Sequence, residues 1–226
     1  MKYKLSNNAP ENEEDLIKRA FSLTGKKIVE LCEPFNKFFN EKSKKSKGYL
    51  GKILEMYLGA SAGNLPIPDF PNLKIELKIL PLNKNMLPKS NVKICYNSNM
   101  PTQSNYKWDS SIVKLKLNKV LWIPIEADSS IPLRERRICH PFLSHLKDYE
   151  NIIKEDYKNI TYFLFSGKME YISANLGKYL ILQSISSNKN LTNYFNFDGD
   201  LIRTNFKAFY LKKNYLRKII YENLHL

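Results

Sequence analysis

The sequence predicts an α/β fold in which helices flank a central mixed β-sheet. Three observations support this class. Hydrophobic residues make up 43% of the chain and aromatic residues 12%, segments of helical periodicity alternate with short apolar runs, and no linker or internal repeat interrupts the sequence. A chain of 226 residues can bury a substantial core. We therefore expect residues 1–226 to form a single domain, organised as two lobes.

The helices are predicted from their end signals and their apolar spacing. The first follows Pro10, carries acidic residues in its first turn and closes at Gly25. A second covers residues 27–32, and a long one over residues 146–166 stops at Gly167. The C-terminal helix begins at about Lys213. The helix within "GYLGKILEMYLGASAG" (48–63) has its apolar residues at i, i+3, i+4, i+7 and i+8, namely Leu50, Ile53, Leu54, Tyr57 and Leu58.

Four short apolar segments are predicted to be strands. They are "KIELKILPL" (74–82), "NVKICYN" (91–97), "KVLWIPIE" (119–126) and residues 179–183. The segment "SIVKLKLNK" (111–119) would place Lys114, Lys116 and Asn118 on one face if it is extended. The segment "NKNLTNYFNFDGD" (188–200) is expected to be a polar loop.

The charge balance indicates a polyanionic partner. Lys and Arg number 36 against 22 Asp and Glu, which gives a formal net charge of +14. Such an excess is typical of proteins that bind nucleic acid. A genome rich in A and T would also enrich Lys, Asn and Ile, so the charge alone does not establish the partner.

The sequence carries no signal for export or membrane insertion. No apolar run reaches bilayer length, and the N-terminal residues lack the apolar stretch of a signal peptide. The three cysteines are widely spread and follow no metal-ligand spacing, and the pair Cys139-His140 has no second cluster. We therefore expect a reduced, cytoplasmic protein.

The segment "DFPNLKIELK" (69–78) concentrates the candidate chemistry. Asp69 precedes a proline-bearing turn, and Glu76 and Lys78 share one face of the strand that follows. The helix that carries Glu55 ends a few residues before Asp69, so these two carboxylates are expected to converge. Such a group is either a salt-bridged strand end or a metal-dependent active site.

Magnesium suits this set of residues. It takes oxygen ligands and commonly uses one or two carboxylates together with water and a substrate phosphate. Asp69, Glu76 and the carbonyl of Leu77 supply such ligands, while Lys78 is placed to orient the attacking water. The chain has no Gly-x-Ser-x-Gly elbow, Walker loop or dinucleotide fingerprint, so serine-hydrolase, kinase and dehydrogenase functions lack their marker residues.

Five segments together resemble the MutH family of DNA mismatch repair endonucleases. They are "KGYLGKILEMYLGASAG", "DFPNLKIELK", "KVLWIPIE", "SIPLRERR" and "FYLKKN", and they occur in the family's order and at its spacing over nearly the whole chain. The resemblance implies the restriction-endonuclease-like fold of the PD-(D/E)xK type, with two lobes that form a DNA cleft.

The resemblance also implies an activity. Members use Mg²⁺, for which Mn²⁺ can substitute, to nick the unmethylated strand of hemimethylated DNA 5′ to the G of GATC. It further implies a monomer in the bacterial cytoplasm that is activated by MutL and has MutS as an indirect partner.

The resemblance assigns roles to individual residues. Asp69, Glu76 and Glu55 would hold the metal, Lys78 would serve the attacking water, and Lys116 matches a lysine near the active site. The DNA-contacting residues would be Lys47, Lys114, Lys212 and Tyr210, of which Tyr210 matches a tyrosine that senses adenine methylation. Where the family has Arg-Pro-Lys, this chain has Gln183-Ser184-Ile185. Gln183 can donate one hydrogen bond to a base, but it lacks the guanidinium that contacts guanine at two atoms.

Two alternatives remain from the sequence. A GATC-specific restriction enzyme would share the same site but cut both strands. A DNA-binding protein that has lost turnover would keep the fold without the chemistry, although four clustered ionisable groups destabilise a fold unless their charges are compensated.

Overall fold

The computed structural model describes residues 8–33, 46–97, 107–185 and 191–224. Within them the chain is α/β and divides into two compact units. Unit 1 comprises residues 1–90, 119–144 and 219–226, and unit 2 comprises residues 91–118 and 145–218. Each unit is thus assembled from separate stretches of sequence, in keeping with the absence of a linker.

Unit 1 is built on a sheet with the strand order β1-β3-β4. Its strands are β1 (Glu76–Leu82), β3 (Lys119–Glu126) and β4 (Phe142–His145). β1 and β3 run parallel, with Glu76 opposite Val120 and Lys78 opposite Trp122. Residues 120–125 of β3 are all buried, as the near-continuous apolar run predicts for a parallel strand.

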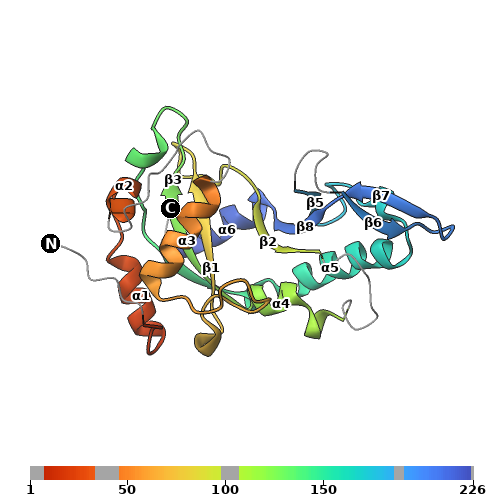
Figure 1. The fold of residues 1–226 in the computed structure, drawn as a ribbon, viewed down its shortest axis with the longest axis horizontal. Helices are drawn as coiled ribbons and strands as arrows, with labels where there is room; N and C mark the ends of the chain where they lie inside the picture. The colour runs from red at the N-terminus through yellow and green to blue at the C-terminus, as the bar shows by residue number, and fades with distance from the viewer. Residues whose placement is uncertain (1–7, 34–45, 98–106, 186–190, 225–226) are drawn as a thin grey trace. The chain divides into compact units, whose positions relative to one another are not determined.

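Three helices of unit 1 pack with this sheet (Figure 1). They are α1 (Glu13–Phe21), α2 (Ile28–Cys32) and α3 (Ser46–Leu58). α1 starts at Glu13 because the side chain of Asn12 accepts a hydrogen bond from the amide of Asp15 at 2.9 Å and caps the helix. The shared core combines the apolar faces of the helices with side chains from the sheet, among them Leu16, Ile28, Ile53, Leu54, Leu58, Leu77, Leu121 and Ile123.

Unit 2 is built on an antiparallel sheet with the strand order β2-β8-β5. Its strands are β2 (Val92–Tyr96), β8 (Lys207–Leu211) and β5 (Leu180–Ser184). The long helix α5 (Glu150–Phe165) packs Tyr157 against Phe209, with ring centroids 5.5 Å apart. The final helix, α6 (Lys213–Leu224), begins where the sequence predicts.

The α/β class is confirmed, but the strands of the central mixed sheet that we expected are divided among separate sheets. The described strands form three separate sheets, of which the third is a two-stranded sheet of β6 and β7. β2 follows β1 in sequence but pairs with β8, more than a hundred residues later. Neighbours in sequence often pair, so the local pattern favoured one sheet, but a distant partner leaves no local signal.

The segment that we considered as extended around Lys114 is helix α4 (Ile112–Leu117). The side chain of Ser111 caps it by accepting from the amide of Lys114 at 3.1 Å, and Val113 and Leu117 form its buried side. Residues two apart on a helix point about 200° away from each other. Lys114 and Lys116 therefore do not share one face.

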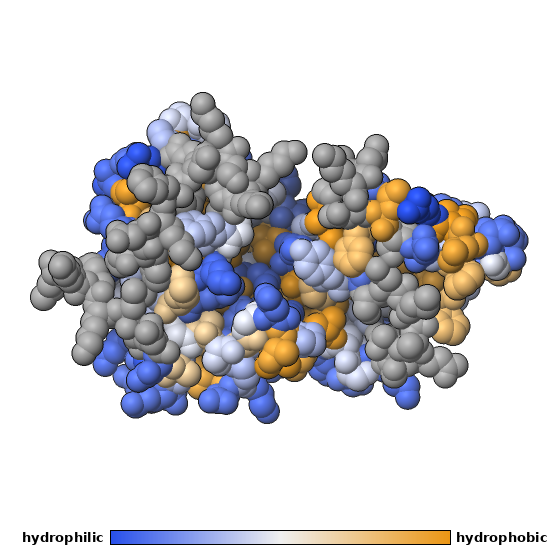
Figure 2. Space-filling view, viewed as in Figure 1, coloured by the Kyte–Doolittle hydropathy of each residue, from blue (hydrophilic) through white to orange (hydrophobic). Residues whose placement is uncertain are grey.

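The predicted polar loop over residues 188–200 is also wrong in part, because it contains a strand of a hairpin. β6 (Leu191–Phe195) pairs antiparallel with β7 (Leu201–Asn205), and the connection contains Asp198-Gly199. Aspartate-glycine between two alternating segments is a hairpin signal that the polar composition concealed. Several large apolar side chains of the hairpin are exposed (Figure 2), namely Leu191, Phe195, Phe197, Leu201 and Ile202.

No helix in the described ranges is both long enough and apolar enough to cross a membrane.

Candidate active site and DNA-contacting residues

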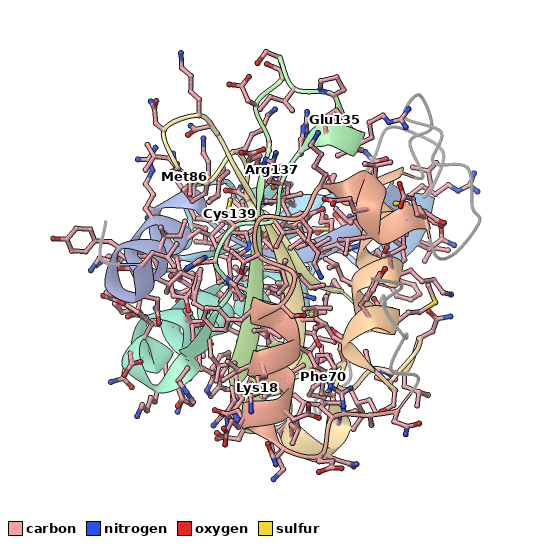
Figure 3. All side chains as sticks on the ribbon, turned by 90° about the vertical axis from the view of Figure 1, so that its left-hand side faces the viewer. Lys18, Phe70, Met86, Glu135, Arg137 and Cys139 are labelled. Atoms are coloured by element: carbon pink, nitrogen blue, oxygen red, sulfur yellow. The ribbon has the colours of Figure 1, made fainter. Side chains whose placement is uncertain are left out.

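A tight turn sets the spacing of the candidate active site. Phe70 and Ile75 exchange two backbone hydrogen bonds of 2.9 and 3.2 Å, and a short 3-10 turn at Pro71–Leu73 connects them. Lys74 completes the turn in the left-handed region at φ 56°. In Figure 3, Phe70 lies at one end of the sheet, and Glu135 and Arg137 lie at the other end. The turn therefore brings the residue before Phe70 back beside the start of β1.

Asp69 is fixed on both sides by backbone groups. Its Oδ2 accepts a hydrogen bond of 2.8 Å from the amide of Leu77 in β1. Its carbonyl accepts from the amides of Ser61 and Ala62 at 3.1 and 3.3 Å. The carboxylate is thus held against the strand that carries Glu76 and Lys78, as the sequence predicts.

Glu76 and Lys78 form an ion pair through Oε1 and Nζ. The side chain of Glu76 is only 1% exposed and that of Lys78 is 16% exposed. Burying a charged group is costly unless it is paired with an opposite charge. Lys78 supplies that charge.

Glu55 joins the group from the end of α3. The helix ends at Gly59, whose φ of +79° and whose approach to the Asn8 carbonyl leave no space for a Cβ, which would lie 2.2 Å from that oxygen. Burial raises the pKa of Glu55. The carboxylate of Asp69 and, more weakly, that of Glu76 also raise this pKa, while Lys52 and Lys78 lower it. These effects place Glu55 within electrostatic reach of the other three residues.

The donor chemistry of this acidic cluster (Glu55, Asp69, Glu76 and Lys78) fits a small divalent cation. Burial raises the pKa of Glu55 most, and repulsion from the neighbouring carboxylates adds to it; a bound cation would relieve that repulsion. In the described parts of the chain, no group of three or more His, Cys, Asp and Glu is arranged to hold a metal. The assignment of all three acids as ligands stays a prediction. One or two carboxylates are enough for magnesium, which retains several waters.

Two of the predicted DNA-contacting residues lie on one face of the β2-β8-β5 sheet. Tyr210 of β8 is opposite Ile181, and Gln183 of β5 is opposite Ala208. Directly opposed residues share a face, as do residues two apart on a strand. Gln183 is exposed and Tyr210 is half-buried. Both are therefore in unit 2, on a surface separate from the packing of Phe209 against α5.

Two lysines that were predicted to contact DNA, Lys114 and Lys212, have contacts within unit 2. Lys114 pairs with Asp109 at 2.7 Å and with Glu150 at 3.0 Å. Lys212 donates to the carbonyls of Ala174 and Gly177 at 3.0 and 2.7 Å. These contacts give both residues a role inside unit 2.

Two predicted lysines remain without a structural test. Lys116 lies on α4 in unit 2, whereas the acidic cluster belongs to unit 1. Lys47 falls in the first turn of α3, and its side chain is outside the described residues. The assignments of Lys116 to the active site and of all three DNA-contacting lysines, Lys47, Lys114 and Lys212, stay predictions.

The sequence did not reveal two contributors to the site. Lys52 lies one helical turn before Glu55 and lowers its pKa, a relationship that the i, i+3 spacing could have indicated. The amides of Ser61 and Ala62 anchor Asp69. Only the small residues of this segment hinted at so close a backbone approach.

Comparison with known proteins identifies relatives over most of the chain. A family model described as "DNA mismatch repair enzyme MutH" matches residues 58–156. The chain is 36% identical over 213 residues to the DNA mismatch repair protein MutH of Escherichia coli, and the match covers 93% of each chain. The protein of the same description from Shigella flexneri matches with the same identity and coverage.

Proposed function

The chain belongs to the MutH family of DNA mismatch repair enzymes, and on this premise we propose that it nicks the unmethylated strand of hemimethylated GATC sites, 5′ to the G. Family membership makes it a mismatch repair endonuclease, an enzyme that acts on DNA. The proposal adds the sequence of the site, the strand that is cut and the metal that is used.

The observation that carries the proposal is the acidic cluster. Asp69 is held beside β1 by the amide of Leu77, and Glu76 and Lys78 project from that strand as an ion pair. Hydrolysis of a phosphodiester requires the attacking water to be placed and the developing negative charge to be stabilised. Carboxylates and an amine on one rigid strand can do both.

We propose that Asp69 and Glu76 hold Mg²⁺, with Glu55 close by, and that Mn²⁺ can substitute for it. The cation would lower the pKa of a bound water and neutralise charge on the phosphate. Lys78 would orient that water and contact the phosphate oxygens. Its ion pair with Glu76 holds the Nζ in place beforehand, so little rearrangement is needed when DNA binds.

The remaining parts of the proposal rest on family membership. Double-stranded DNA is the substrate, MutL is the activator and MutS acts through it, and the enzyme is a monomer in the bacterial cytoplasm. The fold is proposed to be restriction-endonuclease-like, with two lobes that form a DNA cleft. The formal net charge of +14 supports a DNA partner.

A strand-specific cleavage assay tests the proposed function. Unmethylated, hemimethylated and fully methylated GATC duplexes, labelled on each strand, would be incubated with Mg²⁺, with and without MutL, and resolved on denaturing and native gels. We expect nicks in the unmethylated strands alone, and more of them with MutL. Concerted double-strand cuts that do not depend on MutL would instead indicate a restriction enzyme, and binding without cleavage in Mg²⁺ or Mn²⁺ would indicate a protein that only binds DNA.

A further inference from the structure

A β-bulge changes which side chains of β2 face the surface that carries Tyr210. Lys93 is opposite Tyr210, but the register shifts after it, so that Cys95 is opposite Phe209 and Tyr96 is opposite Ala208. Residues three apart on a regular strand point to opposite faces. Because the bulge inserts one residue, Lys93 and Tyr96 both lie on the face of Tyr210 and Gln183.

The Tyr96 side chain is held in place yet remains available for contact. Lys93 Nζ donates to its hydroxyl at 2.9 Å and lies 4.1 Å from the ring centroid. The ring of Phe206 meets it edge-on, with centroids 5.6 Å apart. Even so, Tyr96 is 53% exposed. The Lys93 ammonium lies over the ring and Phe206 packs against it, but more than half of the side chain remains exposed, so apolar ring surface is still available for contact.

Tyr96 also lies close to Tyr210. Burial raises the pKa of the Tyr210 phenol, and the proximity of Tyr96 raises it further. Because Tyr96 and Gln183 are both opposite Ala208, two residues from Tyr210 on β8, the two rings and Gln183 lie on one face of the sheet. The Gln183 amide offers a hydrogen-bond donor and an acceptor but no apolar surface, so an aromatic ring on the same face would add a kind of base contact that Gln183 cannot make.

We propose that the Tyr96 ring is a further specificity-determining residue, which contacts the C5-methyl group of a thymine in the recognition site. This inference rests on the proposed function, because it takes GATC as the substrate. Aromatic and other apolar side chains identify thymine in the major groove through this methyl group, which cytosine lacks.

Replacing the two thymines of a GATC duplex by deoxyuridine removes only the methyl groups and so tests the contact directly. Equilibrium binding would be measured without divalent metal, and nicking would be measured with Mg²⁺. For the wild type we expect the thymine duplex to bind about fourfold more tightly than the uracil duplex, which corresponds to one buried methyl group. Tyr96→Ala should bind both duplexes equally, whereas Tyr96→Phe, which keeps the ring, should retain the preference.

A matched control is Tyr162→Ala. Tyr162 is 66% exposed, lies on α5 in the same unit and should leave the thymine preference unchanged. A wild type that prefers GATC but does not distinguish thymine from uracil, or a Tyr96→Ala variant that still does, would overturn the inference alone. A wild type with no preference for GATC over a scrambled duplex would overturn the proposed function, and this inference with it.

Discussion

At the residue scale, the acidic cluster shows how a protein can bring several charged groups together and still fold. Glu76 is almost fully buried but paired with Lys78, and Asp69 accepts a backbone hydrogen bond. Glu55 is the member whose pKa is raised by burial and by the neighbouring carboxylates. The folded protein therefore disfavours the ionised form of Glu55 relative to the unfolded chain.

Glu55→Gln should stabilise the protein at neutral pH in the absence of divalent metal. Because the folded-state pKa of Glu55 lies above its ordinary value of 4.5, the wild type loses stability relative to the variant as the pH rises through that pKa. We expect a gain of roughly 0.5–1 kcal/mol at pH 7, in the range of partly exposed charge interactions. Urea unfolding at pH 3.5 and pH 7 would measure it. If Glu55→Gln were more stable than the wild type by the same amount at both pH values, ionisation of Glu55 would not be the cause of the difference in stability.

Mg²⁺ should raise the melting temperature of the wild type and do so much less for Glu76→Gln. A ligand that binds only the folded state stabilises it by about 2.7 kcal/mol at one hundred times its dissociation constant, which corresponds to about 5–10 °C for a chain of this size. Differential scanning fluorimetry with a Mg²⁺ titration would measure the shift without any DNA. Asp128→Asn, which changes a carboxylate in the loop after β3, serves as a control. Equal shifts in both variants and the wild type would place the metal elsewhere.

At the element scale, a second buried carboxylate positions a strand of unit 2. Asp156 of α5 is 5% exposed and accepts hydrogen bonds from the amides of Lys178, Tyr179 and Leu180 at 2.7, 2.6 and 2.8 Å. Gly177 permits this close approach, because a Cβ there would lie 1.9 Å from the Leu180 carbonyl oxygen. The helix thereby fixes the start of β5, the strand that carries Gln183.

Asp156→Asn should destabilise the protein by roughly 2–4 kcal/mol. The amide group turns one acceptor into a donor that faces backbone N–H groups, and hydrogen bonds to a charged acceptor are worth about 1.5–3 kcal/mol. Chemical denaturation at pH 7 would measure the loss. Asp198→Asn, on the exposed connection of the β6–β7 hairpin, should change stability little. Equal stability of both variants would mean that Asp156 does not anchor β5.

The sequence predicts elements best where the signal is local. The 27–32 helix, the stop at Gly167 and the start at Lys213 follow from capping residues and periodicity, and the structure confirms them to within a residue. The strand character of residues 76–82 and 119–126 is likewise confirmed. The pairing of β2 with β8 and the bulge after Lys93 depend on contacts between distant segments, so periodicity could not reveal them.

The candidate site shows the same distinction between features with a local sequence signal and features without one. Alternation along β1 was enough to place Glu76 and Lys78 together. The position of Asp69 depended on the turn between Phe70 and Ile75, for which proline was a visible signal but the left-handed Lys74 was not. The helical state of residues 112–117 was missed because Lys-Leu alternation suits a strand as well, and only the Ser111 cap indicated a helix.

At the scale of the whole molecule, the excess of positive charge should govern DNA affinity. With a formal net charge of +14, binding is expected to release counterions from the phosphate backbone. Affinity should fall by about 10³-fold between 50 and 200 mM salt, as is typical for six or more phosphate contacts. Fluorescence anisotropy with a labelled duplex would measure it. A flat response to salt would mean that the charge serves another purpose.

The most direct test of the central claim, that the acidic cluster cleaves DNA, is the single-turnover nicking rate of Asp69→Asn on a hemimethylated GATC duplex in Mg²⁺ with MutL. Binding of the same duplex would be measured in parallel, and Asp128→Asn would serve as the control. Loss of a carboxylate that we propose holds the metal should lower the rate by about 10³-fold or more, while affinity should stay within a few-fold of the wild type. Nicking by Asp69→Asn at the wild-type rate would contradict the account.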